Sequence, residues 1–336
     1  MARAAGLELR VDDRLEAEIE GISRRFAERM RRPYAHFAAG VRKQATLPEG
    51  AVSLGLAGTA PGFVLRTAAG AVVVLPGPPA ELQRLWPRAL ETEPVRAVVA
   101  RATAPERRVL RFFGASESAV AHALAEAGGD GDGVEATICA RDFEIHVDLV
   151  VDPGADERAD ELERRLVAPL EQWLFARDER PVQELVLAAA RERGLRLATA
   201  ESCTGGLVAA RLTSISGSSD VFVGGVVAYS NDAKERELDV PHALLDVHGA
   251  VSAEVAAAMA QGARARLDAD VAIAVTGIAG PGGGTPEKPV GLVFLHASSA
   301  DGELARRFEF PGDRDAVRTR ATVVALHLVR GLVTKS

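Results

Sequence analysis

The chain has 336 residues, of which 40 are basic and 47 acidic, so its formal net charge is −7. At roughly 150 residues per domain this length predicts two or three domains, and a hydrophobic content of 47% indicates globular cores. The acidic balance provides no overall basic field, so nucleic-acid binding is not expected.

The cysteines and the chain start exclude several other classes. Cys139 and Cys203 lie far apart without the neighbours that a disulfide framework or a structural zinc site requires. The N-terminal MARAAGLELR lacks an apolar signal core, and no uncharged apolar run reaches the ~18 residues that span a bilayer. We therefore expect a soluble, cytoplasmic protein with no metal site, no cofactor and no membrane partner.

The first hundred residues predict helices and strands in alternation. Residues 11–32 carry apolar side chains at helical spacing on a charged background, which predicts a surface helix that ends at Pro33. A strand over 63–66 and a second beginning at 71 follow, and the second ends at the Gly/Pro loop of residues 76–79. A helix over 80–86 comes next.

A new unit begins near residue 106 and predicts a small α+β module. Its expected elements are a strand at 107–113, a helix at 116–127, a GGDGDG turn, strands at 135–140 and 143–151, and a long charged helix near 155–175. No catalytic constellation is evident in it, so we interpret it as a spacer or docking module. ARDERPV at 176–182 is the expected linker to the last domain.

The last part alternates strands, glycine turns and helices, which predicts a layered α/β domain with a mostly parallel sheet. The expected strands lie at 195–200, 221–230, 269–277 and 290–299, and the expected helices at 182–194, 207–214, 252–267 and 315–333. We expect the final helix to be amphipathic.

A serine turn follows the first of these strands, in AESCTGG. Ser202 stands where a buried strand gives way to a helix, and such a turn would present its hydroxyl to solvent. The first free N–H groups of the helix, near Thr204, Gly205 and Gly206, would form an oxyanion or phosphate site. The structural alternative is that the serine only caps the helix.

A serine hydroxyl needs a base before it becomes a nucleophile. The chain has only four lysines, two tyrosines and one asparagine, and YSNDAK concentrates Tyr229, Asn231 and Lys234 in six residues. We therefore expect Lys234 to be the base, with its pKa lowered by burial or positive charge, and Tyr229 to relay the proton. The histidines at 242, 248, 296 and 327 are the alternative bases, although none lies in a motif with an acid.

A glycine-rich loop, TGIAGPGGG, follows the strand at 269–277. Loops of this kind at the carboxyl ends of parallel strands bind phosphates or nucleotides through backbone N–H groups, which makes Thr276, Gly277 and Gly280 candidate ligand contacts. A flexible surface loop is the alternative. Arg314 and Arg318, after FPGD, offer guanidinium groups for phosphate.

Five ordered blocks over about 155 residues resemble the C-terminal domain of the CinA family of competence/damage-inducible proteins: AESCTGG, VVAYSNDAK, HGAVS, TGIAGPGGGTPEKPVG and FPGDRDAVR. Members of this family include nicotinamide-mononucleotide amidases. The resemblance implies hydrolysis of the nicotinamide carboxamide to ammonia and nicotinic acid mononucleotide, in pyridine-nucleotide salvage. It also implies a serine–lysine–tyrosine centre, here Ser202, Lys234 and Tyr229.

The earlier parts resemble the same family. VRKQATLPEGA, GTAPGF and VVVLPGPPAEL resemble the second half of its molybdopterin-binding-like domain, while the TGGLGPT-like segment of the first half is not found before residue 33. RFFGASES resembles its KH-type connecting domain, without the GxxG clamp for nucleic acid. The expected organisation is therefore a partial α/β molybdopterin-binding-like domain at 1–104, a KH-type module at 105–178 and an amidase domain at 179–336.

Two other functions remain open at this stage. The first is a non-catalytic nucleotide-binding regulator of the competence or damage response. The second is ADP-ribose pyrophosphatase activity of the N-terminal domain, for which the missing glycine-rich segment leaves an incomplete pocket. As partners we expect a small-molecule nucleotide substrate and a second copy of the chain in a homo-oligomer.

Overall fold

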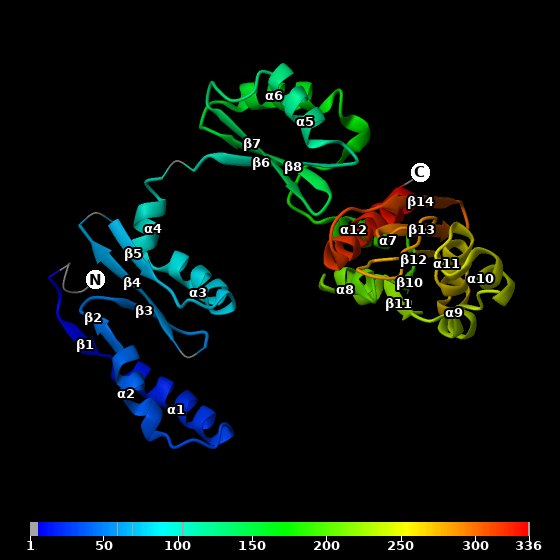
Figure 1. The fold of residues 1–336 in the computed structure, drawn as a ribbon. Helices are drawn as coiled ribbons and strands as arrows, with labels where there is room; N and C mark the ends of the chain where they lie inside the picture. Colours follow the sequence, from blue (N-terminus) through cyan, green and yellow to red (C-terminus); the bar gives the residue numbers. More distant parts are fainter. Residues whose placement is uncertain (1–5, 59, 69, 103, 335–336) are drawn as a thin grey trace. The chain divides into compact units, whose positions relative to one another are not determined.

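The computed structural model describes residues 6–58, 60–68, 70–102 and 104–334. The chain forms two compact units, Met1–Ala104 and Pro105–Ser336 (Figure 1). Thr59 of GTAPGF, the start of the N-terminal segment and Lys335 lie outside the described residues. Within the described ranges, no helix combines the length and apolar character that a membrane crossing requires.

The first unit begins with a helical pair beside a two-stranded ribbon. The helix predicted over 11–32 is confirmed as α1, Asp13–Arg29, and Asp12 caps it by accepting a hydrogen bond from Leu15 N at 2.9 Å. Its buried face includes Leu15 and Ile19, which pack with Val41 of α2, Ala35–Gln44. The ribbon pairs β1, Leu9–Val11, with β2, Thr46–Pro48.

A three-stranded antiparallel sheet completes this unit. Its strands are β3, Val52–Leu56, β4, Pro61–Thr67, and β5, Gly70–Val74, and its helices are α3, Pro79–Glu91, and α4, Glu93–Val99. Both strands predicted between 63 and 76 are thus confirmed. The helix expected at 80–86 continues to Glu91, because Leu85 and Ala89 bury their side chains against Val64.

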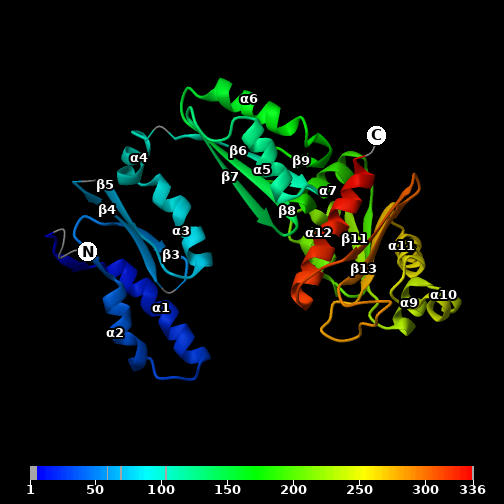
Figure 2. The ribbon, with the colours of Figure 1, turned by 45° about the horizontal axis from the view of Figure 1, so that its top comes forward.

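In the middle module of the second unit, four antiparallel strands carry two helices. The strands lie in the order β7, β8, β6, β9, with bounds Val134–Arg141, Glu144–Val151, Glu106–Phe113 and Leu174–Ala176. Helices α5, Glu117–Glu126, and α6, Asp156–Val167, lie together on the sheet (Figure 2). The helix expected over 155–175 ends at Val167, since Pro169 cannot continue it, and the chain then forms β9.

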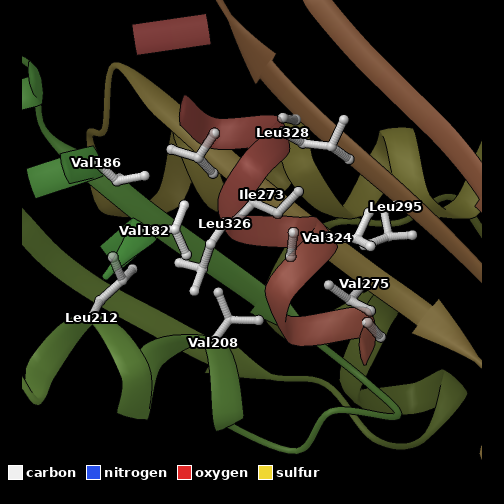
Figure 3. Close-up of a cluster of buried hydrophobic side chains, with 14 of the residues drawn as sticks. Val182, Val186, Val208, Leu212, Ile273, Val275, Leu295, Val324, Leu326 and Leu328 are labelled. Carbon is white, nitrogen blue, oxygen red and sulfur yellow. The ribbon is translucent and has the colours of Figure 1, made fainter. Parts of the chain in front are cut away.

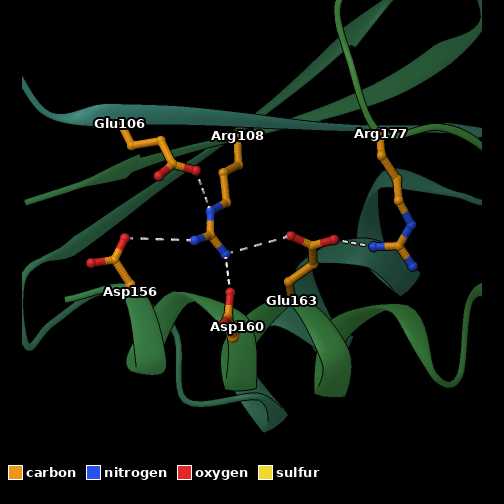
Figure 4. A network of polar contacts seen from close by, with 6 residues as sticks. All are labelled: Glu106, Arg108, Asp156, Asp160, Glu163 and Arg177. Carbon is orange, nitrogen blue, oxygen red and sulfur yellow. Dashed lines mark hydrogen bonds and ion pairs between the residues drawn. The ribbon is translucent and has the colours of Figure 1, made fainter.

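One arginine ties this sheet to α6. Arg108 donates to Glu106 at 2.8 Å and to Asp160, and it also lies 3.8 Å from Asp156 (Figure 4). Glu163 of α6 faces Arg108 on one side and pairs with Arg177 on the other. The network therefore joins β6, α6 and the end of β9 along one edge of the module.

The C-terminal domain has three layers. Its sheet has the strand order β11, β10, β12, β13, β14, with bounds Phe222–Val227, Leu197–Glu201, Val271–Gly277, Leu292–Ser299 and Glu303–Glu309. One face carries α7, α8 and α12, with bounds Val182–Glu192, Leu207–Thr213 and Arg314–Val333. The other carries α9, α10 and α11, with bounds Asn231–Leu238, His242–His248 and Ala253–Leu267 (Figures 1 and 2).

The layered α/β prediction is confirmed, but the expectation of a mostly parallel sheet is wrong. Strand β10 pairs in parallel with β11 and β12, whereas the β12–β13 and β13–β14 pairs are antiparallel. A parallel pair needs a crossover connection, usually a helix. The glycine loop joins β12 to β13 and a short turn joins β13 to β14, so neither connection can cross over the sheet.

Side chains of different size cover the two faces of the sheet. Ile273, Val275 and Leu295 pack beneath α12 (Figure 3). The opposite face presents alanines toward α11, namely Ala198, Ala200, Ala272 and Ala274. Because α11 is itself rich in alanine, this layer packs at close range, while large aliphatic side chains fill the layer beneath α12.

The last helix is more deeply buried than the sequence predicts. We expected an amphipathic helix, yet every residue from Ala321 to Val329 of α12 is buried. One side packs on β12 and β13, another on α7, and His327 contacts the middle module. A helix enclosed on several sides needs apolar residues all round, which explains its run of valine, alanine and leucine.

The close packing of α11 predicts a steric test. A Cβ atom on Gly262 would lie 1.9 Å from the backbone oxygen of Leu238 in α9, so Gly262→Ala should destabilise the second unit by about 2–3 kcal/mol. Gly21 in α1 is the matched control, since its nearest neighbour is the mobile end of Arg25 at 3.6 Å. Gly21→Ala should be neutral or stabilise by roughly 0.5–1 kcal/mol. Calorimetric unfolding measures both, and equal effects would contradict this packing.

Candidate active site

The carboxyl ends of three parallel strands meet at one edge of the C-terminal sheet. Ser202 follows β10 and continues the ladder, donating its N–H to Val275 O of β12 at 2.9 Å. On the other side, Ala228 N donates to Glu201 O at 2.8 Å. The chain leaves β10 for β11 on one side and β12 on the other, so Ser202 lies at the switch point where open α/β sheets bind ligands.

The turn after β10 is built around a buried carboxylate. Glu201 is 1% exposed, and its side chain accepts hydrogen bonds from the N–H groups of Gly206, Val208 and Ala209 at 2.9, 3.1 and 2.9 Å. It thereby satisfies the first free donors of α8. The expectation that Gly206 offers a free N–H to a ligand is therefore wrong.

The same turn buries the serine. Ser202 is 8% exposed, contrary to the expected exposed hydroxyl, and the next two residues are also buried. Gly205 and Gly206 have φ values of 61° and 97°, in the left-handed region that favours glycine. Gly205 N donates to Ser202 O at 3.0 Å. Thr204 is fully buried, and its hydroxyl has no hydrogen-bond partner among the residues that the structure describes.

Lys234 reaches the serine from the first turn of α9. Ser230 caps this helix by accepting from Ala233 N at 3.1 Å, which fixes where the helix begins after β11. Lys234 is 1% exposed, and its Nζ lies 3.1 Å from Ser202 Oγ and 2.9 Å from Ala228 O. The structure therefore brings the predicted nucleophile and base into hydrogen-bond distance.

Burial controls the protonation of this centre. It lowers the pKa of Lys234, because the ammonium loses its hydration without gaining a carboxylate partner. It also raises the pKa of the neighbouring Cys203 thiol to about 12, so that side chain stays neutral. The N–H groups of Cys203 and Thr204 lie beside the thiol. They lower its pKa, but the effect of burial is larger.

Tyr229 occupies a different place from the one expected. It is 60% exposed, and its hydroxyl accepts a hydrogen bond from Arg314 Nη2 at 2.8 Å. Arg314 also donates through Nη1 to Gly280 O at 2.9 Å. The tyrosine is thus tied to the glycine loop by an arginine, and within the described residues its hydroxyl makes no hydrogen bond to Lys234.

Arg318 holds the serine turn from the other side. It donates to Cys203 O at 3.2 Å through Nε and to Thr204 O at 3.0 Å through Nη2. Its remaining Nη1 lies 3.6 Å from the exposed carboxylate of Asp315. Two of its three nitrogens therefore fix the backbone that carries the nucleophile.

Strand direction explains why these arginines reach the site. Gly277 at the end of β12 pairs with Val293 near the start of β13, which pairs with Phe308 near the end of β14. Two antiparallel steps return the chain to the edge of the sheet where Ser202 lies. Helix α12 then begins at Arg314, so both arginines stand beside the strand ends.

The glycine loop is fastened to the segment before α11. Thr276 is buried and donates through its hydroxyl to Ala250 O at 2.7 Å, and Lys288 Nζ donates to His248 O at 2.5 Å. A Cβ on Gly277 would lie 2.7 Å from Leu292 O. Two of the sequence blocks, HGAVS and the glycine loop, are thus joined by side-chain-to-backbone hydrogen bonds. Asn231, in contrast, is an exposed residue of α9.

The histidines lie in other environments. Each has an acidic partner outside the Ser202 turn: His242 with Glu235, His248 with Glu254, His296 with Glu303 and His327 with Glu144. Within the described part of the chain, no three His, Cys, Asp or Glu side chains gather closely enough to hold a metal ion.

Sequence reasoning missed Glu201 and Cys203. Both stand inside AESCTGG, but burial and hydrogen bonding give them their roles, and neither can be read from one sequence. One signal was present, since an acidic residue at the end of a predicted buried strand has no solvated face and must find donors.

A family model and two relatives match the part of the chain that carries this site. The CinA C-terminal domain model matches residues 179–333. A CinA-like protein of Mycolicibacterium gilvum (strain PYR-GCK) is 46% identical over 336 residues, covering 98% of this chain and 79% of that relative. A CinA-like protein of Mycobacterium tuberculosis (strain ATCC 25618 / H37Rv) is 45% identical over 340 residues, covering 98% and 78%.

Solved structures also match a part of the chain. The competence/damage inducible protein CihA from Agrobacterium tumefaciens is 42% identical, with a TM-score of 0.44, and the match covers 47% of this chain and 99% of that one. A CinA superfamily protein from Klebsiella pneumoniae is 36% identical, with a TM-score of 0.43, covering 46% and 98%.

The buried carboxylate of Glu201 generates a stability prediction. Glu201→Ala would leave three helix donors without their acceptor, so the free energy of unfolding should fall by about 2–4 kcal/mol. Glu287→Ala, at an exposed glutamate of the glycine loop, is the control and should change it by less than about 0.5 kcal/mol. Denaturant unfolding followed by circular dichroism measures the difference, and an unchanged midpoint for Glu201→Ala would show that this carboxylate does not cap α8.

Proposed function

The chain belongs to the CinA family, and from that membership and the Ser202–Lys234 contact we propose that it hydrolyses the carboxamide of nicotinamide mononucleotide. The products are ammonia and nicotinic acid mononucleotide. The observation that carries the proposal is the 3.1 Å separation of Lys234 Nζ from Ser202 Oγ, with both side chains buried.

The environment of Lys234 supports its role as the base. A lysine can take a proton only when its amine is neutral, and burial lowers the pKa of Lys234 toward that state. The neutral amine would accept the Ser202 proton while keeping its own hydrogen bond to Ala228 O. That second bond orients the lone pair toward the serine.

Oxyanion stabilisation is assigned to the start of the turn. Glu201 already holds the N–H groups of Gly206, Val208 and Ala209. We therefore assign the oxyanion donors to the N–H groups of Cys203 and Thr204, whose neighbour is a weakly accepting neutral thiol. Arg318 would keep both donors in place through the carbonyls of the same two residues.

The reaction proceeds in two halves. Ser202 Oγ attacks the carboxamide carbon as its proton passes to Lys234, giving a tetrahedral oxyanion. When the intermediate collapses, Lys234 returns the proton to the leaving nitrogen, so ammonia departs and an acyl ester remains on Ser202. Water then attacks the ester, giving its proton to Lys234, which passes that proton to the departing Ser202 Oγ. The acid product is released and ionises to its carboxylate.

Substrate binding is assigned to the surface around Tyr229. Arg314 connects the exposed Tyr229 to Gly280 of the glycine loop. An exposed tyrosine ring offers a stacking surface for the pyridine, and the arginine beside it adds positive charge for the phosphate. In this assignment Tyr229 orients substrate, since its hydroxyl bonds to Arg314.

An ammonia-release assay with the full chain tests the function directly. We expect ammonia and nicotinic acid mononucleotide in equal amounts from nicotinamide mononucleotide. Nucleotide binding without ammonia would instead favour a regulatory binding protein. Cleavage of ADP-ribose without ammonia release would favour the pyrophosphatase alternative.

Removal of the nucleophile gives the first mutational prediction. Ser202→Ala should lower kcat by several powers of ten, because it removes the hydroxyl that Lys234 contacts. Its affinity for nicotinamide mononucleotide, measured by calorimetry, should stay within about twofold of wild type. Ser214→Ala, at an exposed serine after α8, should keep full activity. Substantial turnover by Ser202→Ala would exclude Ser202 as the nucleophile.

The proposed base predicts how activity changes with pH. Because burial lowers the pKa of Lys234, kcat/KM should rise with pH through a value below the ordinary lysine range and then level off. Lys234→Arg should lose at least about a thousandfold in kcat, since guanidinium does not release its proton. Lys43→Arg, at an exposed lysine of α2, is the control. Near wild-type turnover by Lys234→Arg would contradict the serine–lysine mechanism.

A further inference from the structure

The tip of the β7–β8 hairpin contacts the segment that leads into the active site. Phe143 stands at this tip, and its ring lies edge-on to Phe310 at 5.6 Å and to Phe308 at 6.1 Å. Both partners belong to the end of β14 or follow it directly. The middle module therefore touches the C-terminal domain where the chain turns toward α12.

The backbone at this tip is strained. Asp142 and Phe143 have φ values of 50° and 71°, so both lie in the left-handed region. A tight hairpin turn demands this conformation, and glycine or asparagine usually supplies it. A bulky aromatic residue is unfavourable there, and such strain persists where a contact compensates for it. The edge-on contacts of Phe143 with Phe308 and Phe310, and with Phe113 at 6.5 Å, provide that compensation.

The next residue anchors the hairpin a second time. Glu144 is buried and accepts hydrogen bonds from His327 of α12 at 2.7 Å and from His146 at 3.2 Å. Burial alone would raise the pKa of Glu144, but these two partners lower it to about 2, so the side chain is a carboxylate at neutral pH. Phe113 stacks on His327 with ring centroids 3.7 Å apart.

The two anchors enclose the arginines of the site. Phe310 precedes Arg314 by four residues, and His327 follows Arg318 by nine. Between the anchors, the first turns of α12 face a cleft of about 780 Å³ that the hairpin also lines, with Asp315 and Thr319 on the α12 side. On this side of α12 the hairpin is the neighbouring element, while the opposite side packs into the core through Val317.

We propose that Phe143 is a positioning residue of the active site: its ring, seated on Phe308 and Phe310, fixes the start of α12 and thereby the position of Arg314. This inference rests on the proposed function, because it assigns Arg314 to the substrate surface. It also gives the middle module a role in the reaction beyond that of a spacer.

The kinetic test compares two phenylalanines of similar exposure. Phe143 is 44% exposed, and Phe26 of α1 is 48% exposed with one edge-on partner, Phe37, at 6.0 Å. Phe143→Ala should raise KM for nicotinamide mononucleotide about tenfold, because the ring loses its pairs with Phe308 and Phe310, while kcat stays within about threefold. Phe26→Ala should leave both constants unchanged. Phe143→Leu keeps apolar volume at the tip, so its KM should lie between those of wild type and Phe143→Ala.

A double-mutant cycle separates positioning from general loss of stability. If Phe143 acts through Arg314, then Phe143→Ala should add nothing to the KM of Arg314→Ala. An unchanged KM in Phe143→Ala overturns the proposal. The proposal is also overturned if the KM increase of the double variant equals the product of the two single increases, since the two residues would then act independently.

Hydrogen exchange provides a readout that needs no turnover. Backbone amides of residues 308–318 should exchange at least about fivefold faster in Phe143→Ala than in wild type or Phe26→Ala. Equal exchange rates in that segment would overturn the positioning role. If wild type releases no ammonia, the proposed function fails, whereas the exchange rates still decide whether Phe143 holds the start of α12.

Discussion

A lysine buried beside a serine is the constraint on which this site depends. Lys234 is 1% exposed, and its hydrogen-bond partners are the neutral oxygens of Ser202 and Ala228. An ammonium in such a place is unfavourable without a carboxylate partner. The one carboxylate at the end of β10, that of Glu201, is occupied by three N–H groups of α8. The fold therefore favours the neutral amine that deprotonation of a serine requires.

The mixed sheet is what makes this arrangement possible. Its parallel half sends β10, β11 and β12 toward one edge, where the serine turn, α9 and the glycine loop follow. Its antiparallel half brings β14 back to the same edge, so α12 starts beside the turn. A fully parallel sheet would have needed further helical crossovers to bring the arginines of α12 to the serine.

Motif residues in this domain divide into two groups. Ser202 and Lys234 face one another, whereas Thr276, Arg314 and Arg318 donate hydrogen bonds to backbone carbonyls of neighbouring loops. The second group joins loops that are far apart in sequence, and loops without such bonds would sample many conformations. Much of the sequence signal in the motif blocks therefore reflects loop positioning as well as chemistry.

The sequence by itself determined the types of most elements and the position of the serine turn, and it predicted Lys234 as the base for Ser202. These follow from local patterns: hydrophobic periodicity, a glycine turn after a strand, and a lysine in a lysine-poor chain. Only the tertiary structure decided that Ser202 is buried, that Glu201 takes the free donors of α8, that Tyr229 pairs with Arg314, and that half of the sheet is antiparallel. Each of these depends on which distant segments meet, and local periodicity carries no information about that.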